Sequence, residues 1–313
     1  MESWARVAVL LLAAVSRPAA LPGQGEGGAA DHMVRLSPHA WAWIAADDRS
    51  SNSALIVGDS GALVVDPGLT PGVVREFLAA VRSVTDRPVR YVVLTHWHPD
   101  HALGITCLAD RFATIVAHPA TRRALADHGA QVAAQLAAEA PTADERKSLE
   151  TCAGRLPDSL VADRTVIDLE GVAVEVWHPG WAHTAGDLVV WLPGERVLVT
   201  GDIFMHEASP DMDGAHPVEW AVVLDSLVGL VPSAVVAGHF GPSTPRDLVR
   251  FRDYLHAVVD RSRDALDRGV PPDSVPDRVS LQDFGEFVQY PQYHATFRDN
   301  VRATVRQLDG GRD

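Results

Sequence analysis

The densest group of chemically active side chains lies in Thr95–His101, which reads THWHPDH and holds three imidazoles and a carboxylate. His96 and His98 are two residues apart and can converge on one metal ion from a tight loop. Asp100 and His101 follow closely enough to serve a second ion beside the first. Neutral imidazole and carboxylate ligands favour zinc, with iron and manganese as alternatives. The competing interpretation is a polar loop with surface histidines.

Buried strands must position these side chains. The apolar run at 89–95 predicts a strand that ends at the histidine cluster, which is where sites in α/β folds are usually built. Other candidate ligands stand beside similar apolar runs: Asp66, His183, Asp202 and His239. A lone Asp or His at such a place is more often a helix cap or a surface residue. The information therefore lies in the order of these residues along the chain.

This order resembles that of the metallo-β-lactamase-fold hydrolase superfamily, over roughly residues 34–250. The resemblance implies an α/β fold, a four-layer αββα sandwich with a two-metal site at one edge of its paired sheets. Asp202 resembles the carboxylate of thioesterase, lactonase, phosphodiesterase and sulfatase members, whereas true β-lactamases of the superfamily usually carry Cys or Ser there. The pattern is most similar to exported hydrolases associated with quinoprotein or sulfur-oxidation systems.

The resemblance also implies a role for each residue. One ion would be held by three histidines: His96, His98 and His183. The other ion would be held by a carboxylate and two histidines: Asp100, His101 and His239. Asp202 would bridge the two ions, and Asp66 would hold the histidine loop in place without binding metal.

Two metal ions imply a hydrolytic chemistry. A hydroxide held between them is a strong nucleophile at neutral pH, because coordination lowers the pKa of water, and Asp100 could orient it and carry its proton. We therefore expect a hydrolase with about two zinc ions per chain, acting on an ester, lactone, thioester or amide-type bond of a small molecule. The alternatives are a β-lactamase-like activity and a metal-binding, redox-associated protein without turnover.

Composition agrees with a large folded core. The chain has 313 residues, of which 47% are hydrophobic and 22% charged, and its net charge is −14. This acidic balance makes nucleic acid a poor partner. No Gly-x-Ser-x-Gly motif occurs, so a serine nucleophile has no support. Gly-x-Gly-x-x-Gly occurs only at 23–28, within the expected leader and not after a predicted strand, so a nicotinamide or flavin cofactor has no support either.

Residues 1–30 read as a signal peptide and leader, with an apolar core at 7–15 that is too short to span a bilayer. We expect a secreted or periplasmic protein without stable membrane insertion after signal removal, or a cytoplasmic one if the leader is not a signal. Residues 31–313 read as one domain, with a helical insert at about 119–155 and a C-terminal extension at about 270–313. Cys107 and Cys152 could pair or stay free, and the oligomeric state is open.

Three further side chains are possible substrate contacts. Trp97 stands between two ligands and would lie near the pocket mouth, unless it only covers the sheet edge. His206 and His216 flank a loop after Asp202 that could line the pocket, although surface histidines are commoner.

Local patterns predict the main elements. Helices are expected at 71–84, 217–230 and 245–267, and also after His101. Two single strands are expected at 113–117 and 232–238. Three hairpins are expected, at 53–57 with 62–66, 165–168 with 172–177, and 188–192 with 196–200.

Overall fold

The computed structural model describes residues 32–46, 50–107, 113–140, 142–152 and 155–310. The expected leader over residues 1–30 and the side chains of Cys107 and Cys152 lie outside this description. No helix within the described ranges is both long enough and apolar enough to cross a membrane.

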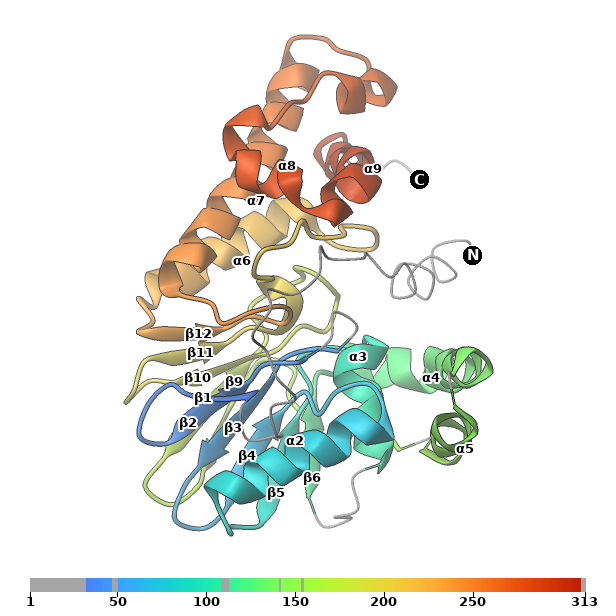
Figure 1. Cartoon of the computed structure of the whole chain (residues 1–313). Helices are drawn as coiled ribbons and strands as arrows, with labels where there is room; N and C mark the ends of the chain where they lie inside the picture. Colours follow the sequence, from blue (N-terminus) through green and yellow to red (C-terminus); the bar gives the residue numbers. More distant parts are fainter. Residues whose placement is uncertain (1–31, 47–49, 108–112, 141, 153–154, 311–313) are drawn as a thin grey trace, which may run out of the picture.

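Two β-sheets form the centre of the fold (Figure 1). The first holds seven strands in chain order: β1 (Met33–Arg35), β2 (Ala40–Trp43), β3 (Ser53–Val57), β4 (Ala62–Val65), β5 (Val89–Val93), β6 (Thr114–Ala117) and β7 (Ser159–Leu160). The second has the order β12-β11-β10-β9-β8, with bounds β8 (Arg164–Asp168), β9 (Ala173–Trp177), β10 (Val189–Leu192), β11 (Val197–Val199) and β12 (Ala234–Val236).

Helices cover the outer faces of both sheets (Figure 1). The first half of the chain supplies α2 (Pro71–Val84), α3 (Pro99–Ala102), η2 (Leu103–Cys107), α4 (Pro119–Glu139) and α5 (Ala143–Cys152). The second half supplies η3 (Gly201–Ile203), α6 (Pro217–Gly229), α7 (Pro245–Asp267), η4 (Pro272–Asp277), η5 (Gln282–Phe284), α8 (Gly285–Gln289) and α9 (Pro291–Leu308). The architecture is the predicted αββα sandwich.

The alternation of side chains along the strands builds the layers. In β4, Leu63 and Val65 point into the core between the sheets, whereas Ala62 and Val64 point into the core under the helices that include α2. Because both faces of β4 are covered, all four of its residues are buried. This explains why the central strands read as continuous apolar runs and not as alternating ones.

Most expected elements occur close to their predicted bounds. The helices at 71–84 and 245–267 match α2 and α7 to the residue. Both begin with Pro after a Thr cap: Thr70 accepts a hydrogen bond from the Val73 backbone, and Thr244 forms a capping box with Asp247.

The helix expected after His101 begins earlier, because Pro99 occupies its first turn. Asp100 and His101 therefore lie within α3 and not in the loop before it. The strand expected at 89–95 ends at Val93, so the histidine motif starts from a short turn. The short strands β1, β2 and β7 were not predicted from the sequence pattern.

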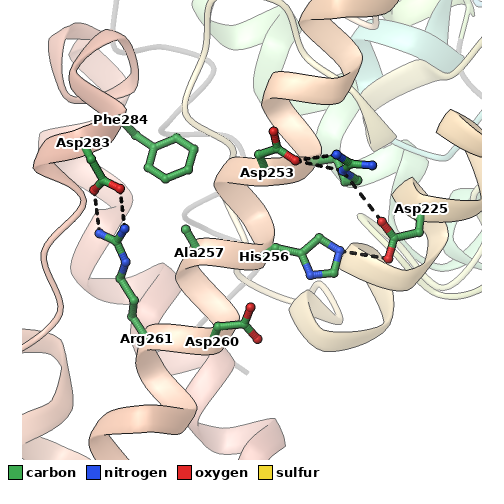
Figure 2. Close-up of a pocket in the computed structure, with 9 residues that line it drawn as sticks. Asp225, Asp253, His256, Ala257, Asp260, Arg261, Asp283 and Phe284 are labelled. Carbon is green, nitrogen blue, oxygen red and sulfur yellow. Dashed lines mark hydrogen bonds and ion pairs between the residues drawn. The ribbon is translucent and has the colours of Figure 1, made fainter.

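The C-terminal segment is fastened to α7 by paired charges. Arg261 forms a two-point ion pair with Asp283 of η5, with nitrogen–oxygen distances of 2.6 and 2.8 Å. A surface cavity of about 560 Å³ lies beside this pair, and Figure 2 shows its lining. On its other side His256 of α7 bonds Asp225 of α6, at 2.9 Å from Nε2 to Oδ2. Because most of its charged side chains pair with one another, we interpret this cavity as the boundary between packed helices and not as a ligand site.

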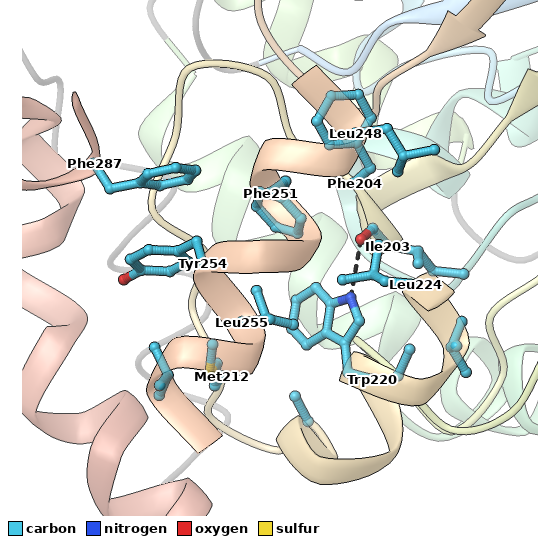
Figure 3. Packing of buried hydrophobic residues seen from close by; sticks show 14 of the residues in the cluster. Ile203, Phe204, Met212, Trp220, Leu224, Leu248, Phe251, Tyr254, Leu255 and Phe287 are labelled. Atoms are coloured by element: carbon cyan, nitrogen blue, oxygen red, sulfur yellow. Dashed lines mark hydrogen bonds between the residues drawn. The ribbon is translucent and has the colours of Figure 1, made fainter. Parts of the chain in front are cut away.

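Trp220 lies at the centre of the core that joins the second sheet, α6, α7 and the C-terminal segment (Figure 3). Its side chain is fully buried, and its indole nitrogen donates a hydrogen bond of 2.9 Å to the carbonyl of Ile203. Ile203 follows Asp202 directly. This contact therefore links the packing of the outer helical layer to the backbone that carries a candidate ligand.

We predict that Trp220→Phe lowers the free energy of unfolding by about 1–3 kcal/mol, because the Ile203 carbonyl loses its buried donor. Val222→Ala on the same helix is the control, since Val222 is 59% exposed, and it should change stability by less than about 0.5 kcal/mol. Chemical denaturation of both variants beside the wild type measures the difference. Equal stability of the two variants would contradict the assignment of Trp220 to the core.

Candidate metal centre

The predicted ligands lie at one edge of the two sheets. Asp66 directly follows β4, and His96 follows β5 after a short turn. Asp202 lies in η3 after β11, and His239 follows β12. His183 comes from the loop before β10. Each sheet therefore delivers part of the site from its strand ends, and the site exists only when both sheets are packed together.

The seven predicted ligands form two groups, each of which could hold a metal ion. One group contains His96, His98, His183 and Asp202, and the other contains Asp100, His101 and His239. Within each group the potential ligand atoms lie within 4.8 Å of one another. The division of the histidines and Asp100 is the one that the family resemblance implied, with Asp202 placed in the first group, and their role as ligands stays a prediction.

Asp202 reaches both groups. Its Oδ2 lies 3.8 Å from Nε2 of His96, and its Oδ1 lies 3.2 Å from Nε2 of His101 and 3.5 Å from Nε2 of His239. Asp100 belongs to the second group alone, with Oδ2 at 2.9 Å from Nε2 of His239 and 3.5 Å from Nε2 of His101. The positions of the two carboxylates suit a bridging ligand and a ligand to one ion.

Asp66 holds the histidine motif by three contacts. Its carboxylate accepts hydrogen bonds from the backbone nitrogen of Thr95 at 2.8 Å and from the Thr95 hydroxyl at 2.6 Å. It also accepts one from Nδ1 of His101, at 2.8 Å. This contact places a proton on Nδ1 of His101 and turns Nε2 toward Asp202. Contacts of this kind orient a metal ligand and set its tautomer.

Thr95 orients the ring of His96 and sets its tautomer in the same way. Its hydroxyl lies 3.1 Å from Nδ1 of His96 and already donates to Asp66, so it accepts from this ring nitrogen. Nε2 of His96 is then unprotonated and faces the candidate site. The sequence analysis did not predict this role of Thr95. The one indication in the sequence was a hydroxyl residue directly before His96.

Two glycines allow the ligands to approach one another. A Cβ on Gly238 would stand 1.9 Å from Oδ1 of Asp202, a distance no side chain can occupy. Gly201 has a φ of +51°, and a Cβ there would stand 2.3 Å from the Thr95 hydroxyl. The small residues beside the candidate ligands thus leave room for the site and for its supporting hydrogen bonds.

Asn52 joins the two halves of the centre, and sequence reasoning gave it no such role. Its side-chain nitrogen donates to the carbonyls of Ala237 and Phe240, at 3.0 and 2.8 Å. Its side-chain oxygen accepts from the backbone of Ala45. Because Asn52 precedes β3 of the first sheet, these bonds tie that sheet to the turn that carries His239.

The two groups differ in their electrostatics. Burial and the neighbouring imidazoles lower the pKa of His98 to about 3 and that of His96 well below its usual value. Burial likewise lowers the pKa of His183 to about 4. In the second group burial opposes the positive charge, but Asp202 and Asp100 outweigh it and raise the pKa of His239 to about 10.

His101 behaves like His239. Burial disfavours its charge, yet the surrounding carboxylates, Asp202, Asp100 and Asp66, raise its pKa well above the usual value. In the absence of metal, burial thus favours the neutral form of the three histidines of the first group, while the carboxylates favour protons on His101 and His239. A cation that binds the second group must displace them.

The donor set fits divalent metal ions. Nε2 of His96 and Nδ1 of His183 are buried, and neither makes a hydrogen bond within the described part of the chain. A buried polar atom without a partner is costly, so such atoms usually have a ligand that the protein itself does not supply. Two imidazoles with unpaired nitrogens beside a buried carboxylate are the donors that zinc and similar ions take.

The three side chains predicted as possible substrate contacts lie in different surroundings. The ring of Trp97 lies 4.8 Å from that of His98, and Trp97 also packs against the core beneath the first sheet. His216 directly precedes α6, and its ring stacks on the partly exposed Trp181, with 3.8 Å between ring centroids. His206 lies 3.9 Å from Asp247 of α7 and is mostly buried. None of the three belongs to the two candidate ligand groups found among the described residues.

We predict that metal binding to the second group releases protons near neutral pH, whereas binding to the first group releases almost none. Affinity for the second ion should then rise about tenfold per pH unit for each proton displaced. Calorimetric titration of metal-free protein in two buffers of different ionisation enthalpy measures the number of protons. His256→Asn, outside the centre, should leave it unchanged. Proton-free binding at both steps would contradict the charge states described above.

Comparison with known proteins identifies the family and the relatives of this chain. A family model described as the metallo-beta-lactamase superfamily matches residues 46–239, which is more than half of the chain. A linear primary-alkylsulfatase of Pseudomonas sp. (strain ATCC 19151) is 22% identical, over 82% of this chain and 54% of its own length. A metallo-beta-lactamase type 2 of Bacillus sp. (strain 170) is 23% identical, over 60% of this chain and 66% of its own.

Solved structures show the same fold. The stereoselective inverting sec-alkylsulfatase Pisa1 from Pseudomonas sp. superposes with a TM-score of 0.68 at 17% identity, covering 88% of this chain and 50% of that one. The chain thus spans about half the length of the alkylsulfatases that it matches. With the family model extending from the end of the first strands to His239, the chain belongs to the metallo-β-lactamase superfamily.

Proposed function

We propose that this protein is a metal-dependent hydrolase that binds two divalent ions, most suitably zinc, and cleaves an ester-type bond of a small molecule. The observation that carries the proposal is the pair of buried, unpaired ring nitrogens of His96 and His183 beside the carboxylate of Asp202. In a protein of this superfamily, such a constellation is the place where a metal ion would complete the hydrogen-bonding and charge balance.

Each group of residues has a definite part in this proposal. His96, His98 and His183 would hold one ion, Asp100, His101 and His239 the other, and Asp202 both. Ions at such a centre supply Lewis acidity and lower the pKa of water. Asp66 and Thr95 keep the ligand nitrogens turned toward the centre through the hydrogen bonds described above.

Asp100 is the residue we assign to proton handling. Burial disfavours the charge of its carboxylate, but His101 and His239 overcome this and lower its pKa, so it is ionised at neutral pH. Its backbone is fixed by the Ser51 hydroxyl, which donates to the Asp100 carbonyl at 2.8 Å. A fixed, ionised carboxylate at the centre can accept and return the proton of an attacking water.

A sulfate ester is the second candidate substrate, favoured by a specific observation. The similarity to the linear primary-alkylsulfatase extends over 82% of this chain, whereas the similarity to the Bacillus β-lactamase extends over 60%. The additional similarity includes parts of the chain outside the family model. We therefore rank sulfate esters beside carboxylic esters, lactones and thioesters, and β-lactams below them.

Turnover of a substrate panel by protein of defined metal content tests the proposal. The panel contains chromogenic carboxylic, thio-, phosphodi- and sulfate esters, a lactone and a cephalosporin, each with zinc-, iron- and manganese-loaded protein. We expect hydrolysis of at least one ester class, loss on chelation and recovery on metal addition. Two bound ions with no turnover of any member would instead favour a metal-binding protein without hydrolase activity.

We predict that Asp100→Asn reduces turnover of the substrate found in that panel by about a hundredfold or more, because the proton acceptor is lost. Metal content should fall only partly, since the three histidines of the first group are untouched. Elemental analysis and steady-state kinetics measure the two effects. Asp267→Asn, exposed at the end of α7, is the matched control. Near-wild-type turnover of Asp100→Asn with two ions bound would remove Asp100 from this role.

A further inference from the structure

The helix α4 contacts the loop that carries His183. Thr121, in the first turn of α4, is fully buried, and its hydroxyl donates a hydrogen bond of 2.9 Å to the carbonyl of Gly186. A Cβ on Gly186 would stand 2.5 Å from this hydroxyl and 2.7 Å from the Thr121 nitrogen. The loop backbone therefore lies directly against the helix, in a position that only glycine permits.

A second contact from α4 reaches the next residue of the same loop. His118 caps the helix by accepting a hydrogen bond from the Ala120 nitrogen at 3.1 Å. Its ring stacks on that of His178, with centroids 4.3 Å apart and planes 25° apart. His178 in turn donates from Nδ1 to the carbonyl of Asp187 at 2.7 Å. The adjacent carbonyls of Gly186 and Asp187 are thus held by the start of α4, the second through His178.

Hydrogen bonds within the loop connect Asp187 to the residue next to His183. The carboxylate of Asp187 accepts hydrogen bonds from the Thr184 nitrogen at 2.9 and 3.0 Å and from its hydroxyl at 2.6 Å. Thr184 directly follows His183. The loop between Asp187 and His183 is therefore a closed turn, and any shift of its Gly186–Asp187 end moves the candidate ligand.

His183 lacks the side-chain support that His96 and His101 have. His96 and His101 each have a ring nitrogen fixed by Thr95 or Asp66. The ring of His183 has no contact of this kind, because neither of its ring nitrogens makes a hydrogen bond among the described residues. Its ring position is consequently set by the backbone of its loop, and that backbone is held from α4.

We propose that Thr121 is a positioning residue for His183, so that the first turn of α4 sets the metal affinity of the three-histidine group. This rests on the proposed function, since it requires that His183 binds metal. Supporting contacts of a metal ligand typically contribute about ten- to a hundredfold in metal affinity. The helix α4 thereby belongs to the metal centre functionally, although it supplies no ligand.

Three variants separate positioning from folding. Thr121→Val keeps the size and branching of the side chain but removes the donor, and Thr121→Ser keeps the donor. Arg123→Ala is the control on an exposed face of the same helix. Chelator competition measures the affinity for Zn²⁺ and Co²⁺, the Co²⁺ absorption spectrum reports coordination geometry, and denaturation of the metal-free protein reports stability.

We expect Thr121→Val to weaken one of the two binding steps by about ten- to a hundredfold and to change the Co²⁺ spectrum. Thr121→Ser should restore affinity to within a few-fold, and Arg123→Ala should match the wild type. Wild-type affinity and spectrum in Thr121→Val overturn the proposal, as does equal loss in the Val and Ser variants. A wild type that binds no metal refutes the proposed function itself.

If Thr121→Val does not fold, His118→Asn provides a second test of whether the start of α4 positions His183. Asn caps helices well, so this variant retains the start of α4 while removing the ring that stacks on His178. We expect a smaller loss of metal affinity in the same binding step. An unchanged affinity and Co²⁺ spectrum in folded His118→Asn, with no folded Thr121→Val, overturns the proposal.

Discussion

The structure depends on the burial of two carboxylates, Asp100 and Asp202, in one small space with five imidazoles. A buried charge without a partner is very costly, so these groups must satisfy one another or a cation. His101 and His239 lie 2.9–3.5 Å from the carboxylate oxygens, and the carboxylates raise the pKa of both histidines. The same arrangement makes the centre ready to exchange protons for metal ions.

The close approach of these carboxylates and imidazoles explains several residues that are not themselves candidate ligands. Gly238 and Gly201 stand where a side chain would collide with Asp202 or Thr95. Asn52 joins the first sheet to the turn of His239 by two hydrogen bonds. Since the first sheet supplies the histidine motif and the second supplies the remaining ligands, the apolar core between the sheets is a condition for the site. The packing of the two sheets therefore also sets the positions of the candidate ligands.

The outer helices stabilise the centre in different ways. On one side α4 holds the loop of His183 through Thr121. On the other side Trp220 of α6 binds the carbonyl of Ile203, next to Asp202. The C-terminal helix α9 adds a third contact, because Asn300 bonds the backbone of Pro210 and Met212 in the loop after η3. None of these residues has a sequence signature, and Thr121 and Trp220 act through backbone groups next to the candidate ligands or in their loops.

The sequence by itself determined the candidate ligands and most of the elements that bear them. Local rules suffice there: the apolar runs of β4 and β5 specify strands, Pro71 and Pro245 mark helix starts, and the THWHPDH motif brings its own donors together over a few residues. Tertiary structure alone decided which hydroxyls and carbonyls complete the site. Thr95 with Asp66 and Thr121 with Gly186 are separated by 29 and 65 residues. A single donor and a single acceptor at such a distance have no periodicity, and only the packed sheets and helices determine that they meet.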